Sequence, residues 1–291
     1  MEFLRPSSWS EALAAKAAHP TAVPVAGGTD VMVDVNFDRL RPEALLDLSG
    51  VAELTEWSLD GGTVRLGAAV PYARVIGELG DRLPGLAMAS RTVGSPQIRN
   101  RGTLGGNLGS ASPAGDGHPP LLACAAQVEV ASVRGTRLVP ADRFFTGPKR
   151  NALAEDELIA AVHVPVATGP QQFAKIGPRN AMVIAVCSFA LALHPEQHQV
   201  RTGVGSAAPT PIRAERAEQF LRGELADRWE RPDPLPDPVL RRFGELVAQE
   251  TAPIDDVRGS AGYRRHALAV LARRTLSWAW EEHRTGRRAC A

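Results

Sequence analysis

A glycine-rich stretch from Thr92 to Asn107 places the strongest constraint on what this chain can form. The segment, TVGSPQIRNRGTLGGN, contains glycines, hydroxyls, an amide and two arginines, and Asp116 follows shortly after it. Glycine has no Cβ, so backbone N–H groups in such a segment can approach a ligand closely and form a concavity that attracts anions. The stretch predicts a loop that holds a large polar cofactor. A plain glycine-rich connection between strands is the alternative interpretation.

Polar side chains in and after this stretch fit such a ligand. The hydroxyl and amide groups belong to Thr103, Asn107, Ser110 and Ser112. An ionised Asp116 only accepts hydrogen bonds, which suits a carboxylate that holds sugar or ribityl hydroxyls. Arg99 and Arg101 are either surface charges, as is usual for arginine in a loop, or residues that stiffen the loop or approach cofactor phosphates.

A second segment near the start of the chain has a similar character. The apolar run 23–26 leads into Gly27 and Gly28, and Thr29 and Asp30 follow as good helix-capping types. A strand, a glycine turn and a helix start together form a phosphate site, because free N–H groups and the helix dipole point at the ligand. The spaced G-x-G-x-x-G of dinucleotide-binding folds is missing. Alone, the segment indicates only a tight turn. Two such segments in one chain favour a site for a phosphate-containing cofactor.

Together these segments resemble the FAD-binding (medium) subunit of the molybdenum hydroxylases, the xanthine dehydrogenase and carbon monoxide dehydrogenase family. The matching residues are Ala26-Gly27-Gly28-Thr29-Asp30, Thr103-Leu104-Gly105-Gly106-Asn107, Ser112-Pro113 and Asp116. The likeness covers essentially the whole chain, and the second motif is quite specific to the family. The spacing from Ser112 to Asp116 is nearer to the xanthine dehydrogenase branch.

The resemblance implies a set of FAD-binding residues, with no catalytic residue and no metal ligand. The set is Val25, Ala26, Gly27, Gly28, Thr29, Asp30, Val93, Gly94, Thr103, Leu104, Gly105, Gly106, Asn107, Asp116, Ile159 and Lys175. In this family the first segment wraps the FAD pyrophosphate, and the second forms another cofactor loop. By the same likeness, Val93 lies near the isoalloxazine where some relatives carry an aromatic ring, and Ile159 makes an apolar contact. Lys175 aligns with a position close to the flavin, where a cation would stabilise the anionic reduced ring.

Composition and charge exclude several other classes of protein. The chain has 291 residues, of which 44% are hydrophobic and 22% charged, as in ordinary globular proteins. With a net charge of +1, the chain lacks the excess of positive charge that is typical of nucleic-acid-binding proteins. The longest apolar stretch, near residues 183–193, is too short to span a bilayer, and the first residues lack the features of a signal peptide. We therefore expect a cytoplasmic protein that neither binds nucleic acid nor inserts into membranes.

Cysteine and histidine usage argues against a metal or cluster on this chain. Cys124, Cys187 and Cys290 stand far apart, which favours a reducing compartment and disfavours an iron–sulfur or zinc site. The first two lie in apolar runs and are expected in the core. His118 is the one histidine beside the glycine-rich stretch; a general base is conceivable there, but a structural or supporting role is favoured.

The pattern of elements predicts an α+β chain in two parts. The resemblance implies that residues 1–170 form the two-subdomain, PCMH-like FAD-binding fold of the molybdenum hydroxylase flavoproteins, with subdomains at about 1–55 and 56–170. Residues 171–285 are expected to form a C-terminal domain of antiparallel sheet plus helices, and 286–291 a tail. In that domain strands are predicted at 173–176, 182–193 and 199–205, and helices at 214–222, 238–249 and 260–283.

By resemblance, the chain is the FAD-carrying electron-transfer subunit of a heterotrimeric molybdenum hydroxylase. A large partner subunit would hold molybdopterin, a small partner would hold 2Fe-2S clusters, and electrons would pass from this FAD to NAD or another acceptor. A dimer of heterotrimers is the family expectation. One alternative is a stand-alone FAD-dependent reductase or oxidase, which would need an acid or base such as His118 beside the flavin. Another is a non-redox nucleotide-binding or scaffolding subunit that has lost its flavin. The intact glycines and Asp116 argue against that loss.

Overall fold

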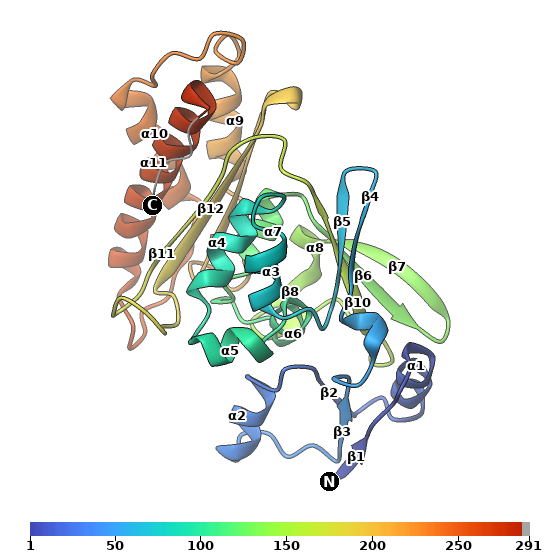
Figure 1. Cartoon of the computed structure of the whole chain (residues 1–291). Coiled ribbons are helices and arrows are strands. Elements are labelled where there is room, and N and C mark those ends of the chain that lie inside the picture. The colour runs from blue at the N-terminus through green and yellow to red at the C-terminus, as the bar shows by residue number, and fades with distance from the viewer. Residues whose placement is uncertain (287–291) are drawn as a thin grey trace.

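The computed structural model describes residues 1–286, so the predicted tail lies outside the described residues apart from Gly286, and so does Cys290. Three main sheets follow one another along the chain, and helices pack between and around them (Figure 1). In the part of the chain that the structure describes, no helix is both long and apolar enough to cross a bilayer.

The N-terminal unit is a small parallel sheet with the strand order β1-β3-β2. Its elements are β1 (Glu2–Leu4), α1 (Trp9–Ala18), β2 (Val23–Val25), α2 (Val31–Asn36), β3 (Ala44–Asp47) and the 3-10 helix η1 (Ala52–Leu54). Ser8 begins α1 by accepting a hydrogen bond from the backbone N–H of Glu11. The strand β1, which was not predicted, adds a third strand to the sheet.

The middle unit is an antiparallel sheet with the order β4-β5-β10-β6-β7. Its elements are β4 (Trp57–Asp60), β5 (Thr63–Gly67), α3 (Tyr72–Glu78), α4 (Pro84–Thr92), α5 (Pro96–Arg101), α6 (Leu104–Ser110), α7 (His118–Ala123), β6 (Gln127–Ser132), β7 (Gly135–Pro140), α8 (Ala141–Phe144), β8 (Phe145–Gly147), β9 (Arg150–Asn151) and β10 (Leu158–Pro165). The β4–β5 turn uses Gly61 and Gly62 at φ of 50° and 79°, which a two-residue hairpin loop requires. One continuous apolar core joins this sheet to the N-terminal unit, with Leu46 and Leu66 fully buried in it.

The glycine-rich stretch is helical, so the prediction of a loop was wrong. It forms the short helices α5 and α6, which meet at Gly102. Each begins at a hydroxyl cap, because the Ser95 side chain accepts from Ile98 N and the Thr103 side chain accepts from Gly106 N. Capping of this kind stabilises a helix start by about 1 kcal/mol, which offsets the low helix propensity of the glycines.

The C-terminal unit is the antiparallel sheet β11-β12-β13 with three helices, close to the ranges predicted. Its elements are β11 (Gln171–Ile176), β12 (Cys187–His194), the 3-10 helix η2 (Pro195–Gln197), β13 (Gln199–Gly205), α9 (Glu215–Glu224), α10 (Asp237–Gln249) and α11 (Ala261–Thr285). The structure confirms the mixed α+β class. Cys124 and Cys187 are both buried, as expected.

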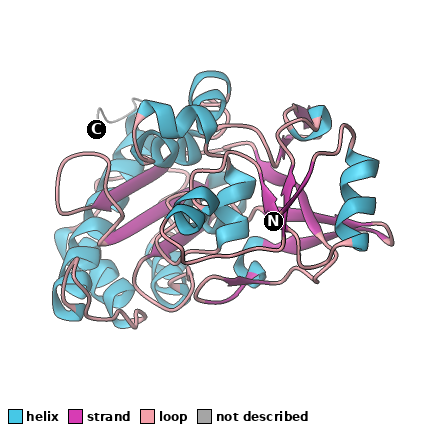
Figure 2. Ribbon diagram, turned by 90° about the horizontal axis from the view of Figure 1, so that it is seen from below, coloured by secondary structure: helices cyan, strands magenta, loops and turns pink. Residues whose placement is uncertain are grey.

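This C-terminal sheet has helices on both faces (Figure 2). Along β12, Phe189 and Leu191 face a core formed with α9, α10 and α11, whereas Ala190 faces α4 and α7 of the middle unit. Small residues on that second face allow close packing, because a Cβ at Gly203 would lie 2.0 Å from the carbonyl oxygen of Pro119. The two parts of the chain are thereby held together through tightly packed backbone.

Candidate functional site

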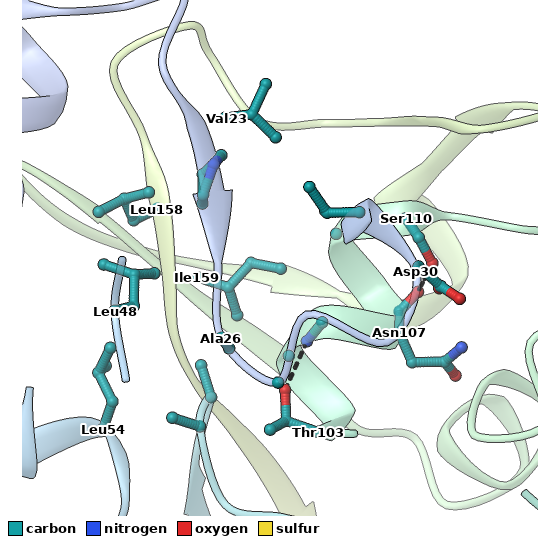
Figure 3. A pocket seen from close by; sticks show the side chains of 18 of the residues that line it. Val23, Ala26, Asp30, Leu48, Leu54, Thr103, Asn107, Ser110, Leu158 and Ile159 are labelled. Carbon is teal, nitrogen blue, oxygen red and sulfur yellow. Dashed lines mark hydrogen bonds between the residues drawn. The ribbon is translucent and has the colours of Figure 1, made fainter. Parts of the chain in front are cut away.

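A cavity of about 480 Å³ opens where the N-terminal unit, α6 and β10 meet. Its size is typical of sites for cofactors and other small ligands. Figure 3 shows two kinds of lining: aliphatic side chains, among them Leu48 and Ile159, gather on one side, and polar side chains, among them Asn107 and Ser110, on the other. The cavity therefore suits a ligand with both an apolar part and a polar part.

Four consecutive backbone N–H groups, those of Gly27 to Asp30, border the cavity. Within residues 1–286 these groups donate to no protein acceptor. Gly28 has φ of 75°, a conformation that glycine adopts readily and that turns the chain here. Because successive unpaired N–H groups in a turn attract negative charge, the segment can bind an anionic group such as a diphosphate.

The two glycine segments touch each other, and the contact depends on missing side chains. A Cβ at Gly27 would lie 1.8 Å from the carbonyl oxygen of Arg101, and one at Gly105 would lie 2.5 Å from that of Ala68. Gly106 differs, because its Cβ would meet only the hydroxyl of Thr103, at 3.1 Å. Gly27 and Gly105 thus let the backbones pack, whereas Gly106 leaves space beside the cavity.

The cavity wall contains most, but not all, of the residues that the resemblance implied. Those in the wall are Ala26, Gly27, Gly28, Thr29, Asp30, Val93, Thr103, Gly105, Gly106, Asn107 and Ile159. Those outside the wall are Val25, Gly94, Leu104, Asp116 and Lys175. Leu104 is buried in the core, where it anchors α6.

The wall also contains residues that the sequence analysis did not assign to the site. They are Lys16, Pro20, Val23, Pro24, Val31, Leu48, Leu54, Ala68, Ala69, Tyr72, Ile98, Gly102, Gly109, Asn151, Leu153, Ala154, Glu155, Glu157 and Leu158. Gly102 and Gly109 could have been found from their position in or beside the second motif. Leu48, Leu54, Leu153 and Leu158 belong to neither glycine segment, and only the packing of the N-terminal unit against β10 brings them to the cavity.

Asp116 and Lys175 pair with each other instead of facing the cavity. Lys175 Nζ donates to Asp116 Oδ2 at 2.5 Å and to the carbonyl oxygen of Thr92 at 3.1 Å, and the two side chains are 6% and 8% exposed. Burial raises the pKa of Asp116, and the ammonium of Lys175 opposes that rise. The lysine expected as a cation beside the flavin therefore has its charge compensated, and the pair joins β11 to the segment after α6.

Arg99 stiffens the polypeptide rather than lining the cavity. Its Nη1 donates to the carbonyl oxygens of Val93 and Gly94 at 3.1 and 2.9 Å, which fixes the turn between α4 and α5. Arg101 does not line the cavity either. Of the interpretations open for Arg99, the structure supports the one in which it holds the turn.

His118 is a buried structural histidine. It is 0% exposed, its Nε2 lies 3.1 Å from the carbonyl oxygen of Asn107, and its ring packs on Phe145 with centroids 4.4 Å apart. Burial lowers the pKa of His118 to about 4, so the ring is neutral at physiological pH. Since it is not part of the cavity wall, His118 is not placed to act as an acid or base on a ligand there.

The buried His118 predicts a loss of stability in mild acid. In the unfolded chain His118 takes up a proton near pH 6.5, but in the folded chain only near pH 4, so the unfolded state binds more protons between these values. The free energy of unfolding should therefore fall by about 2 kcal/mol from pH 7 to pH 5 through this group. Urea unfolding at pH 7 and pH 5 measures this change in free energy.

The variant His118→Gln should lose this dependence of stability on pH, whereas His266→Gln, at an exposed position, should keep it. The same change in free energy from pH 7 to pH 5 in both variants would contradict the assignment to His118.

A glycine turn with unpaired N–H groups opposite an aliphatic wall suits a nucleotide-type cofactor. Two family models cover most of the chain. Residues 1–167 match the family model of the FAD binding domain in molybdopterin dehydrogenase, and residues 172–279 match the CO dehydrogenase flavoprotein C-terminal domain. The chain is 32% identical over 283 residues to the xanthine dehydrogenase FAD-binding subunit of Escherichia coli O157:H7, covering 94% of each chain. It is 34% identical over 259 residues to the nicotine 6-hydroxylase medium subunit of Paenarthrobacter nicotinovorans, covering 87% of each.

Solved structures agree with this result. The carbon monoxide dehydrogenase from Hydrogenophaga pseudoflava that lacks the Mo-pyranopterin moiety matches with a TM-score of 0.87 and 28% identity over 97% of each chain. The chain belongs to the family of FAD-binding (medium) subunits of the molybdenum hydroxylases. It is the FAD-binding subunit of an oxidoreductase of the xanthine and carbon monoxide dehydrogenase type, which confirms the family, the fold and the class of enzyme inferred from the motifs.

Proposed function

We propose that this chain binds FAD in the cavity described above and transfers electrons as the medium subunit of a molybdenum hydroxylase. The observation that carries the proposal is the row of unpaired N–H groups from Gly27 to Asp30, which faces an aliphatic wall across the same cavity. Those N–H groups suit a diphosphate, and the aliphatic wall suits an aromatic ring. When bound, the flavin supplies the redox chemistry, and the protein supplies position and electrostatics.

The residues outside the cavity wall have supporting roles in this proposal. Leu104 anchors α6 in the core, and Gly94 has φ of 45°, which allows the tight turn between α4 and α5. Asp116 would hold a cofactor hydroxyl through the oxygen that Lys175 leaves free. Because Asp116 compensates the charge of Lys175, the pair exerts a weaker field on a neighbouring ring than a lone cation would.

The wider assembly is part of the same proposal. Electrons would reach this FAD from 2Fe-2S clusters on a small partner subunit, which receive them from a molybdopterin subunit, and would leave to NAD or another acceptor. Several relatives are named medium subunits or medium chains, which supports an assembly with other chains. We also propose a division into an FAD-binding region at 1–170 and a C-terminal domain at 171–285, and a cytoplasmic location.

An absorbance spectrum of the purified chain tests the proposal. We expect a yellow protein with the bands of oxidised flavin, and release by denaturation of a cofactor with the mass of FAD, at about one per chain. A colourless chain that also fails to take up added FAD would overturn the proposal and favour a non-redox subunit. Catalytic turnover of a substrate by the isolated chain would favour a stand-alone reductase or oxidase, although the burial of His118 removes the acid–base group that this alternative needs.

A further inference from the structure

The phenol oxygen of Tyr72 has no role in the cofactor contacts proposed above. The Tyr72 side chain is 3% exposed and lies in the cavity wall at the start of α3. Among the described residues, its phenol oxygen has no hydrogen-bond partner. A buried hydroxyl without a partner is unfavourable by about 1–3 kcal/mol, and such groups in native proteins usually have a ligand, water or functional explanation.

The surroundings of Tyr72 keep the phenol protonated. Burial raises the pKa of Tyr72 well above its usual value, and the carboxylates of Asp116 and Asp30 raise it further. A protonated phenol can donate one hydrogen bond. The O–H of Tyr72 therefore lacks an acceptor among the described residues.

A second unpartnered oxygen lies on the neighbouring segment. Asp116 Oδ2 accepts from Lys175 and from the hydroxyl of Thr92, but Asp116 Oδ1 is buried without a partner. A Cβ at Gly117, the next residue, would lie 3.6 Å from the Tyr72 phenol oxygen, so the two segments are in contact. A donor in the cavity wall and an acceptor on the segment that contacts it thus both lack partners among the described residues.

A hydroxyl group satisfies both requirements, because it can accept from the phenol and donate to the carboxylate. A phosphate could accept from the phenol, but the neighbouring carboxylate of Asp116 would repel it. We propose that Tyr72 is a further cofactor-binding residue, whose phenol donates a hydrogen bond to a hydroxyl of the ribityl chain of FAD beside Asp116. This inference rests on the proposed FAD function and adds a contact that the glycine motifs do not contain.

The chain has only two tyrosines, which permits a direct test on the full-length protein. Freed of cofactor and labelled with ¹³C at the tyrosine ζ carbon, it should give two NMR signals, and Tyr72→Phe assigns them. Tyr263 is 49% exposed and serves as an internal reference. Added FAD should shift the Tyr72 signal and leave that of Tyr263 in place. If FAD binds and the Tyr72 signal does not move, this inference fails while the proposed function stands; if no FAD binds, the proposed function fails as well.

Affinity measurements separate a hydroxyl partner from a phosphate partner. Tyr72→Phe should weaken FAD binding about three- to tenfold, the usual effect of one lost hydrogen bond, and Tyr263→Phe should leave it unchanged. ADP has the diphosphate but no ribityl chain, so it should bind the wild type and Tyr72→Phe equally. Equal losses for ADP and FAD would overturn the assignment to the ribityl chain. Unchanged FAD affinity together with altered stability of the cofactor-free protein would show that the phenol has only a structural role.

Discussion

Replacing Gly27 with alanine is expected to destabilise the protein by roughly 3 kcal/mol and to abolish FAD binding. The added Cβ would lie 1.8 Å from the carbonyl oxygen of Arg101, so the glycine turn and the junction of α5 and α6 would have to move apart. The atoms it meets belong to the backbone, which has no alternative rotamer to adopt. The midpoint of urea unfolding and the amount of flavin retained on purification measure the two effects.

A matched substitution in an open position separates this contact from a general effect of alanine. A Cβ at Gly77, on the exposed side of α3, would have no neighbour within 4 Å. Gly77→Ala should therefore leave FAD binding unchanged and stabilise the protein by up to about 1 kcal/mol, since alanine is the better helix former. If Gly27→Ala behaves like Gly77→Ala, the close approach of the two glycine segments is not required for the site.

The elements of the C-terminal unit could be predicted because their patterns are local. Strand β12 alternates between large and small buried residues. The helices α10 and α11 have clear start signals, a proline in the first turn (Pro238) and a serine cap (Ser260). The helices α5 and α6 are hard to predict because glycine lowers helix propensity, although the hydroxyl caps at Ser95 and Thr103 are local signals that favour them. In the glycine-rich stretch, two capped starts decided the structure.

The site was predictable to the extent that it is contained in motifs. The turn from Ala26 to Asp30 and the residues from Thr103 to Asn107 were assigned to the cofactor site from their motifs, and all of them except Leu104 line one cavity. The aliphatic wall was largely missed, because residues such as Leu48 and Leu158 have ordinary core character in the sequence. Equally, nothing local to Asp116 or Lys175 indicates that they pair, since 59 positions separate them and only the packing of β11 brings them together.

Replacing Lys175 with methionine is expected to lower the free energy of unfolding by about 3–5 kcal/mol. Methionine has a similar length but no charge, so the carboxylate of Asp116 would be buried without its partner. Burial already raises the pKa of Asp116, and loss of the ammonium would raise it further. A folded state that holds the proton more tightly than the unfolded state loses stability as pH rises, so the defect should be largest at high pH and shrink in acid.

Two further variants decide whether the ion pair is the cause. Lys149→Met removes a lysine whose side chain is 70% exposed, and it should change stability by no more than about 0.5 kcal/mol. The double variant Asp116→Asn/Lys175→Met removes both buried charges and should be more stable than Lys175→Met alone, because no unpaired carboxylate is left. Urea unfolding of the three variants at pH 6 and pH 8 gives the comparison. Equal losses in the single and double variants, independent of pH, would mean that the side chain of Lys175 joins β11 to the middle unit through packing and its bond to Thr92 rather than through its charge.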